Sequence, residues 1–222
     1  MQCLPNLYKK NWYILSFLLM ISIASLFLHS YGKSQSFIAL NSYHPFVLNV
    51  FFINLTFMGD GIFAICLILL LRLVYKKNQL TMALGLSFLF SGIVVQGIKN
   101  FVFAPRPRLF FEQGQYLHFL DGVSMANYAS FPSGHTATVF ALATVYAIYT
   151  HSKLKQLFYL WLAVLVGYSR IYLAQHFLLD VIIGAIIGTA TAWLVCYIQY
   201  QYQFGNKKSR QELNITSTML VH

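Results

Sequence analysis

The segment SRIYLAQHFLLD, residues 169–180, places charged side chains in an otherwise apolar stretch of the chain. If it is helical from Gln175 onward, His176 and Asp180 stand four residues apart on one face, so the carboxylate can hold one imidazole nitrogen and leave the other for chemistry. Arg170 adds a planar cation that suits phosphate oxygens. The alternative is a buried ion pair between Arg170 and Asp180, with no role for His176. Because ionisable residues in membrane segments are usually functional, the segment indicates a site.

The composition is that of an integral membrane protein. Of the 222 residues, 58% are hydrophobic and 9% are charged, whereas about 25% are charged in ordinary soluble domains. Six apolar runs approach the roughly 20 residues that a helix needs to cross a bilayer. They predict an all-α, six-helix transmembrane bundle in one domain, residues 1–204, followed by a polar, disordered cytoplasmic tail at 205–222. The runs are residues 11–28, 62–75, 80–103, 136–150, 154–173 and 177–200.

The second run is short for a membrane crossing, so we expect its helix to begin before Gly59 and to leave Asp60 inside the outer edge of the membrane. Asp60 then either accepts a hydrogen bond near the functional face or caps the helix. The apolar stretch that follows Pro45 is too apolar to lie in water. It predicts an interfacial helix on the outer membrane surface.

The basic residues predict the topology of the bundle. The formal net charge is +10, but ten of the fifteen Lys and Arg residues mark one face, which the positive-inside rule assigns to the cytoplasm. This pattern explains the charge without nucleic acid as a partner and places both termini in the cytoplasm. The opposite face is the outer one, which is the periplasmic face of the inner membrane in a bacterium. The ten are Lys9, Lys10, Arg72, Lys76, Lys77, Lys153, Lys155, Lys207, Lys208 and Arg210; the other five are Lys33, Lys99, Arg106, Arg108 and Arg170.

Two of the outer basic residues form the pattern K-x6-RP. Lys99 lies near the outer end of the third run, and Arg106 follows seven residues later between Pro105 and Pro107, which stop the helix and restrain the backbone. An isolated lysine at a helix end is more often a snorkelling side chain than a ligand. The arginine that follows it favours a pair of cations on the outer face.

The segment FPSGHTATVF, residues 131–140, opens the fourth run with a geometry that suits an anion. Pro132 fits a first helical turn, and Ser133 and Gly134 leave backbone N–H groups at the helix N-terminus. His135 follows where it can give a proton to a group on that anion. Alternatively, PSGH is only a capped helix start.

A long loop, residues 108–131, joins the third and fourth runs on the outer face and is rich in aromatic residues. Loops of this length are usually functional or disordered, and the aromatic content favours a lid or a lipid-facing rim, with an interfacial anchor as the alternative. Glu112, His118 and Asp121 within it do not have the spacing of metal ligands.

The three patterns, at residues 99–107, 132–135 and 169–180, resemble the signature motifs of the type 2 phosphatidic acid phosphatase superfamily in order and internal spacing. The resemblance covers the third to sixth predicted helices, and the six predicted spans resemble the membrane-bound branch of lipid phosphatases. It implies a metal-independent hydrolase that removes a phosphomonoester or pyrophosphate from the head group of a lipid. Phosphatidate, phosphatidylglycerophosphate, polyprenyl pyrophosphate and lipid A are the substrates that it suggests.

The resemblance also implies a role for each motif residue. His176 would be the nucleophile that forms a phosphohistidine, and Asp180 would fix its tautomer. His135 would protonate the leaving oxygen and then activate water. With three cations around the phosphoryl oxygens, no metal ion or other cofactor is expected. The residues implied to bind the phosphate are Lys99, Arg106, Ser133, Gly134 and Arg170.

Two other functions fit the same residues. A phosphotransferase on the same fold would pass the phosphoryl group from His176 to a second lipid, and release of phosphate without an acceptor lipid would separate the two enzymes. A six-helix transporter or lipid-binding protein would use the cations only to hold an anion. Loss of turnover on changing His176, with ligand binding kept, would favour an enzyme.

Overall fold

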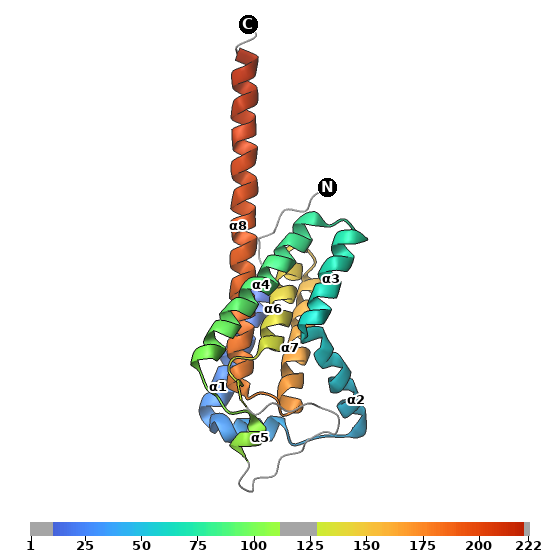
Figure 1. Cartoon of the computed structure of the whole chain (residues 1–222), viewed down its shortest axis with the longest axis vertical. Coiled ribbons are helices and arrows are strands. Elements are labelled where there is room, and N and C mark those ends of the chain that lie inside the picture. The colour runs from blue at the N-terminus through green and yellow to red at the C-terminus, as the bar shows by residue number, and fades with distance from the viewer. Residues whose placement is uncertain (1–10, 112–127, 220–222) are drawn as a thin grey trace.

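The computed structural model describes residues 11–111 and 128–219, and side chains as far as residue 203. Every regular element in these ranges is helical, which confirms the predicted all-α class (Figure 1). The elements are α1 (Trp12–Leu40), α2 (Phe46–Leu55), the 3-10 helix η1 (Thr56–Gly59), α3 (Gly61–Leu73), α4 (Asn78–Phe101), α5 (Pro107–Phe110), α6 (Gly134–Ile148), α7 (Lys153–Tyr172) and α8 (Leu178–Met219).

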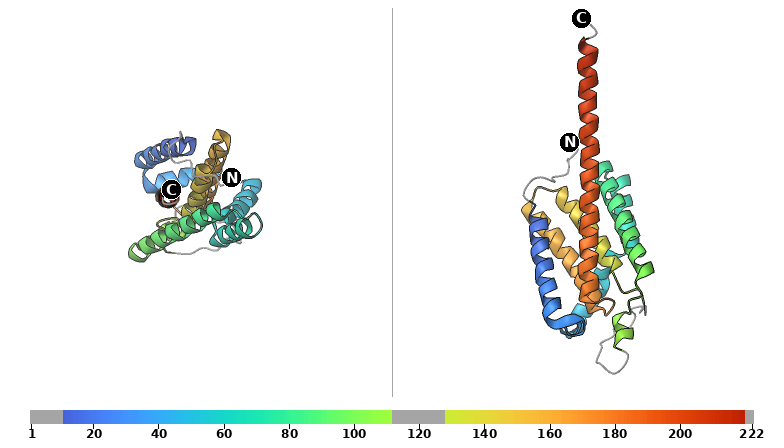
Figure 2. Two further views of the ribbon diagram at one scale, coloured as in Figure 1. Left: turned by 90° about the horizontal axis from the view of Figure 1, so that it is seen from above. Right: turned by 90° about the vertical axis from the view of Figure 1, so that its left-hand side faces the viewer.

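Helix α6 lies at the centre of the bundle, and twelve of its fifteen residues are buried. Helices α4, α7 and α8 pack around it (Figures 1 and 2). Its sequence alternates small Ala and Thr side chains with larger apolar ones, and small side chains let neighbouring backbones approach in a membrane protein. The start of α6 is therefore held firmly against three other helices.

Two glycines of α8 make the closest of these contacts. A Cβ atom added at Gly188 would lie 2.2 Å from the carbonyl oxygen of Ala137, and one added at Gly184 would lie 2.6 Å from the carbonyl oxygen of Ser133. The two glycines are four residues apart, so both face α6. This arrangement, Gly-x-x-x-Gly, brings the start of α8 directly against the start of α6.

Within the part of the chain that the structure describes, three helices are long and apolar enough to cross a membrane: Trp12–Leu40, Asn78–Phe101 and Leu178–Gln203. The pair Phe46–Gly59 and Gly61–Leu73 also meets the criteria when taken together, with a 60° bend, which raises the number to four. Large apolar side chains of α1, including Leu18 and Leu26, point out of the bundle, as a lipid environment requires. The chain is an integral membrane protein, but the predicted count of six spans is not confirmed.

Two predicted boundaries are wrong. Helix α3 begins at Gly61 rather than before Gly59, because the Asp60 side chain accepts the Ile62 N–H at 2.7 Å and starts a new helix there. The tail predicted to be disordered from residue 205 continues α8 to Met219. A helix after Pro45 is confirmed by α2, whereas its position on the membrane surface stays a prediction.

Candidate active site

The predicted site residues come together at one end of the bundle, away from the protruding end of α8 (Figure 1). Lys99 is in the last turn of α4, Arg170 in the last turn of α7, and His135 in the first turn of α6. The charges of Lys99, Arg106, Arg170 and His176 all act on His135, so the three motifs form one cluster. The loop residues 112–127, including Glu112, His118 and Asp121, lie outside the described residues.

A turn at the end of α7 sets the direction of His176. The N–H groups of Gln175 and His176 donate to the carbonyl oxygen of Arg170 at 2.9 and 3.1 Å, and the N–H of Ala174 donates to Ile171 at 3.0 Å. Ala174 has a φ of +51°, the left-handed conformation that closes a helix in a Schellman motif. The turn points the chain back towards the bundle, so His176 lies buried between α7 and α8.

A distant side chain holds the same turn. Nδ2 of Asn41 donates to the carbonyl oxygens of both Ile171 and Tyr172 at 2.8 Å. These oxygens belong to the last turn of α7, where a carbonyl oxygen lacks the N–H four residues on that pairs with it in a helix interior. The segment after α1 thus caps the helix that carries Arg170.

Asp180 lies in the first turn of α8 rather than in a helix that includes Gln175. The helix begins at Leu178, and Oδ2 of Asp180 accepts the N–H of Phe177 at 2.9 Å. The predicted pair is still formed, since Nδ1 of His176 lies 3.5 Å from the same oxygen. That separation is longer than a usual hydrogen bond, so the contact is an electrostatic one.

Ser130 is a site residue that the sequence does not reveal. Its hydroxyl donates to Oδ2 of Asp180 at 2.5 Å, and the two residues are fully or almost fully buried. The N–H of Ser133 also donates to the carbonyl oxygen of Asp180 at 3.0 Å. Nothing distinguishes Ser130 from other serines in the sequence, because its contact depends on how α6 and α8 pack.

Burial controls the protonation of His176, whose side chain is 2% exposed. Loss of water lowers the pKa of His176 to about 4, with the charge of Arg170 acting in the same direction and Asp180 opposing both. The imidazole is therefore neutral at neutral pH. A neutral imidazole has a lone pair that can attack an electrophile.

Ser133 caps α6, as in the alternative interpretation of PSGH as a capped helix start, and Pro132 lies before the helix rather than in its first turn. The hydroxyl oxygen of Ser133 accepts the N–H of Thr136 at 3.4 Å and the hydroxyl of Thr136 at 2.9 Å, and the Ser133 side chain is fully buried. Gly134 and His135 are partly exposed. The accessible part of this helix N-terminus is thus at Gly134 and His135, while the binding of phosphate by Ser133 stays a prediction.

The two arginines of the cluster are held in different ways. Arg106 donates from Nε to the carbonyl oxygen of Tyr128 at 3.1 Å and from Nη1 to Oε1 of Gln175 at 2.6 Å. Arg170 is 7% exposed, and its Nη1 donates to Oγ1 of Thr56 at 2.6 Å. Neither arginine forms a salt bridge within the described residues. A partly buried cluster with excess positive charge favours an anion.

Asp60 faces the cluster from the joint between α2 and α3. Its Oδ2 lies 3.8 Å from Nε2 of His135, and the two side chains are 38% and 31% exposed. Of the two alternatives that the sequence left open for Asp60, the helix cap is confirmed. The 3.8 Å contact with His135 is longer than a hydrogen bond. Among the described residues, no group of three or more His, Cys, Asp and Glu side chains could hold a metal ion.

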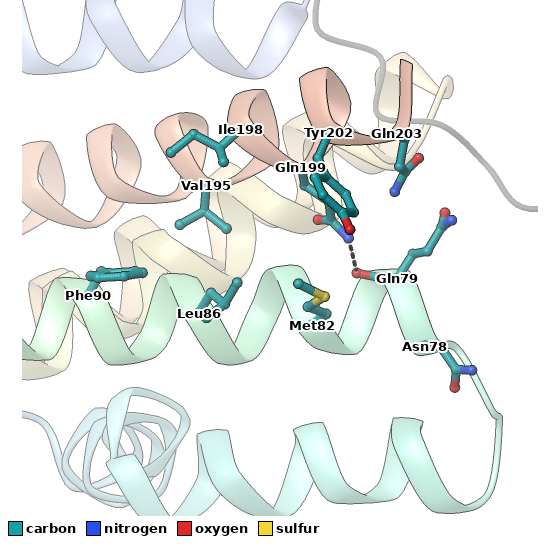
Figure 3. A pocket seen from close by; sticks show the side chains of 10 residues that line it. All are labelled: Asn78, Gln79, Met82, Leu86, Phe90, Val195, Ile198, Gln199, Tyr202 and Gln203. Atoms are coloured by element: carbon teal, nitrogen blue, oxygen red, sulfur yellow. Dashed lines mark hydrogen bonds between the residues drawn. The ribbon is translucent and has the colours of Figure 1, made fainter. Parts of the chain in front are cut away.

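A cavity of about 470 Å³ lies elsewhere, between α4 and α8 (Figure 3). Apolar side chains such as Leu86, Phe90 and Val195 line it, and Gln79 and Gln199 stand at its polar end. The lining residues lie in the first half of α4 and in the middle of α8, whereas Lys99 is in the last turn of α4 and Asp180 in the first turn of α8. The cavity has no part in the charged cluster.

Comparisons with known proteins agree on one family. A family model described as the PAP2 superfamily matches residues 80–204. The chain is 32% identical to Lipid phosphate phosphatase 1 of Arabidopsis thaliana over 161 residues, which is 61% of this chain and 49% of that protein. It is 27% identical to an undecaprenyl-diphosphatase of Sulfolobus acidocaldarius over 197 residues, which is 86% of this chain and 93% of that protein.

A solved structure extends the likeness to three dimensions. The crystal structure of Aquifex aeolicus LpxE matches with a TM-score of 0.64 at 30% identity and covers 73% of this chain and 93% of that chain. The chain spans about half the length of the Arabidopsis thaliana relatives that it matches. The matched family region, 80–204, contains all three motifs but neither Thr56 nor Asp60.

Proposed function

Because this chain belongs to the PAP2 superfamily, we propose that it is a membrane-bound lipid phosphatase that hydrolyses a phosphomonoester or pyrophosphate in the head group of a lipid. The observation that carries the proposal is the meeting of His176, His135 and three cations at one end of the bundle. The names of the relatives, a lipid phosphate phosphatase and an undecaprenyl-diphosphatase, support the substrate class.

In the first step, a neutral His176 attacks the phosphorus atom through Nε2, because Nδ1 faces Asp180. The N–P bond forms, and the bond from phosphorus to the leaving oxygen breaks. His135 gives its proton to that oxygen as the pair of electrons moves onto it. Asp180 stabilises the positive charge that develops on the His176 ring.

In the second step, a water molecule attacks the phosphohistidine. His135, now neutral, takes a proton from the water, the O–P bond forms, and the N–P bond breaks to restore His176. Lys99, Arg106 and Arg170 hold the charged oxygens in both steps. Their charge performs the task that a metal ion performs in other phosphoryl-transfer enzymes, so activity is expected without a metal.

The direction of the bundle in the membrane completes the proposal. The basic residues favour cytoplasmic termini, which put the site on the outer face of a bacterial cytoplasmic membrane. The substrate would then be a lipid of the outer leaflet, such as a polyprenyl pyrophosphate or lipid A.

The test is release of inorganic phosphate by the purified protein from phosphatidate, phosphatidylglycerophosphate, polyprenyl pyrophosphate and lipid A in detergent, with chelator present throughout. Turnover of at least one lipid without an added acceptor is expected, with inhibition by vanadate, which resembles five-coordinate phosphorus. No phosphate from any lipid without an acceptor, but transfer to one when it is added, would make the protein a phosphotransferase. Binding without either reaction would make it a lipid-binding protein or transporter.

A further inference from the structure

The joint between α2 and α3, residues 56–60, contacts the site although it lies outside the matched family region 80–204. Thr56 accepts a hydrogen bond from Arg170 at 2.6 Å. A Cβ atom added at Gly59 would lie 2.9 Å from both the Cβ and the carbonyl oxygen of His135, so the backbones of the joint and of α6 touch. The joint therefore reaches one cation and one histidine of the site.

The carboxylate of Asp60 is held in a fixed direction. Its Oδ1 accepts the N–H of Ile62 at 2.7 Å and caps α3, while Oδ2 lies 3.8 Å from Nε2 of His135. Because the cap holds one oxygen and the contact at Gly59 holds the adjacent backbone, the second oxygen has little freedom to turn away. A charged group that is already held in place does not have to reorient during the reaction, so no free energy of reorganisation is needed.

The charges around His135 show what such a carboxylate can do. Burial lowers the pKa of His135 to about 3, and the charges of Arg170, His176, Lys99 and Arg106 act in the same direction. Asp60 brings a negative charge to the same histidine, since its Oδ2 lies 3.8 Å from Nε2 of the ring. A histidine that must donate a proton has to carry that proton first.

We infer that Asp60 is a positioning residue for His135, whose carboxylate orients the imidazole and favours the protonated form that gives its proton to the leaving oxygen. This inference rests on the proposed function. The competing explanation is that Asp60 only caps α3. Asn and Ser also make good N-caps but carry no charge, so they separate the two roles.

The experiment compares Asp60→Asn, Asp60→Ser and wild type by the dependence of kcat/KM on pH. The substrate is phosphatidate in detergent, or polyprenyl pyrophosphate or lipid A where the wild type releases phosphate from these and not from phosphatidate. In both variants the alkaline limb is expected to move to lower pH by about half to one unit, the size for a partly exposed charge pair at this distance. Asp60→Glu restores the charge and is expected to move the limb back. Hydrolysis of p-nitrophenyl phosphate, whose leaving group needs less protonation, is expected to fall less than that of the lipid substrate.

The matched control is Thr56→Val, which alters the contact of the same joint with Arg170 instead of His135. It is expected to raise KM and leave the alkaline limb in place. The decisive variant is the one, Asp60→Asn or Asp60→Ser, that keeps the wild-type melting temperature. If its alkaline limb stays where it is in the wild type, the inference is overturned and Asp60 is only a helix cap. If the wild type releases no phosphate from any lipid, the proposed function itself has failed, and the role of Asp60 falls with it.

Discussion

Nδ1 of His176 lies 3.5 Å from Oδ2 of Asp180 in a pair that is almost completely removed from solvent. The same carboxylate oxygen accepts hydrogen bonds from the Ser130 hydroxyl and the Phe177 N–H. The direction of the Asp180 side chain is thus fixed both from the residue before α8 and from the segment before α6. A histidine beside so restrained a carboxylate needs little reorganisation to accept positive charge.

The two histidines are expected to differ in the step that they support. Removing a general acid and base costs about 10²–10⁴-fold in rate, so His135→Ala should lose that much turnover but still form an acid-labile phosphoenzyme with a labelled substrate. His176→Ala should form none, because it lacks the attacking nitrogen. The measurement is acid-quenched labelling after brief mixing.

A control for the labelling experiment is His29→Ala, since His29 is exposed on α1, far along the chain from the motifs. It should keep wild-type turnover and labelling. Equal label of equal stability in His176→Ala and His135→Ala would contradict the assignment of the nucleophile.

Ser130→Ala is expected to lower kcat by roughly tenfold or more, because a hydrogen bond to a buried carboxylate contributes about 1.5–3 kcal/mol. The protein should keep its fold, since the change removes one oxygen. The matched control is Ser91→Ala, which removes an equally buried hydroxyl that donates only to Phe88 of its own helix at 3.0 Å. Equal kcat values for the two variants would show that Ser130 does not act through Asp180.

Gly188→Ala is expected to destabilise the protein by about 1–3 kcal/mol, since overpacking forces backbones apart. The added Cβ would meet the Ala137 oxygen at 2.2 Å. A decrease of several degrees in the melting temperature in detergent is the expected readout. Gly85→Ala in α4 is the control, because nothing lies within 4 Å of its added Cβ, and there alanine is expected to be neutral or stabilising.

The proposed direction in the membrane predicts the labelling of single cysteines. In a background without Cys3, Cys66 and Cys196, an impermeant maleimide should react with Ser42→Cys and not with Asn78→Cys in cells with a permeabilised outer membrane. Both residues are exposed. Ser42 lies between α1 and α2, and Asn78 begins α4; these two connections are at opposite ends of the bundle (Figure 1). The reverse pattern would turn the site towards the cytoplasm and exclude lipids of the outer leaflet as substrates.

The sequence by itself determined the all-α class of the fold and which residues belong to the three motifs. Long apolar runs can only be satisfied as helices in a bilayer, and the spacing within 99–107, 132–135 and 169–180 is local enough to be read without a structure. The sequence did not determine where each helix begins, as the starts of α3 and α8 show. At both starts an aspartate side chain, Asp60 or Asp180, accepts a hydrogen bond from a backbone N–H group and holds the first turn. A pattern of apolar residues gives no information about such bonds.

Only the tertiary structure decided which other residues reach the motifs. The bond from Ser130 to Asp180 joins residues 50 positions apart, and the bond from Arg170 to Thr56 spans 114 positions. Such contacts follow from how closely whole helices approach, which Gly184 and Gly188 set by letting the backbones of α6 and α8 touch. The spacing of hydrophobic residues shows which face of a helix is apolar. It does not show which polar atoms of two helices will lie next to each other when those faces pack together.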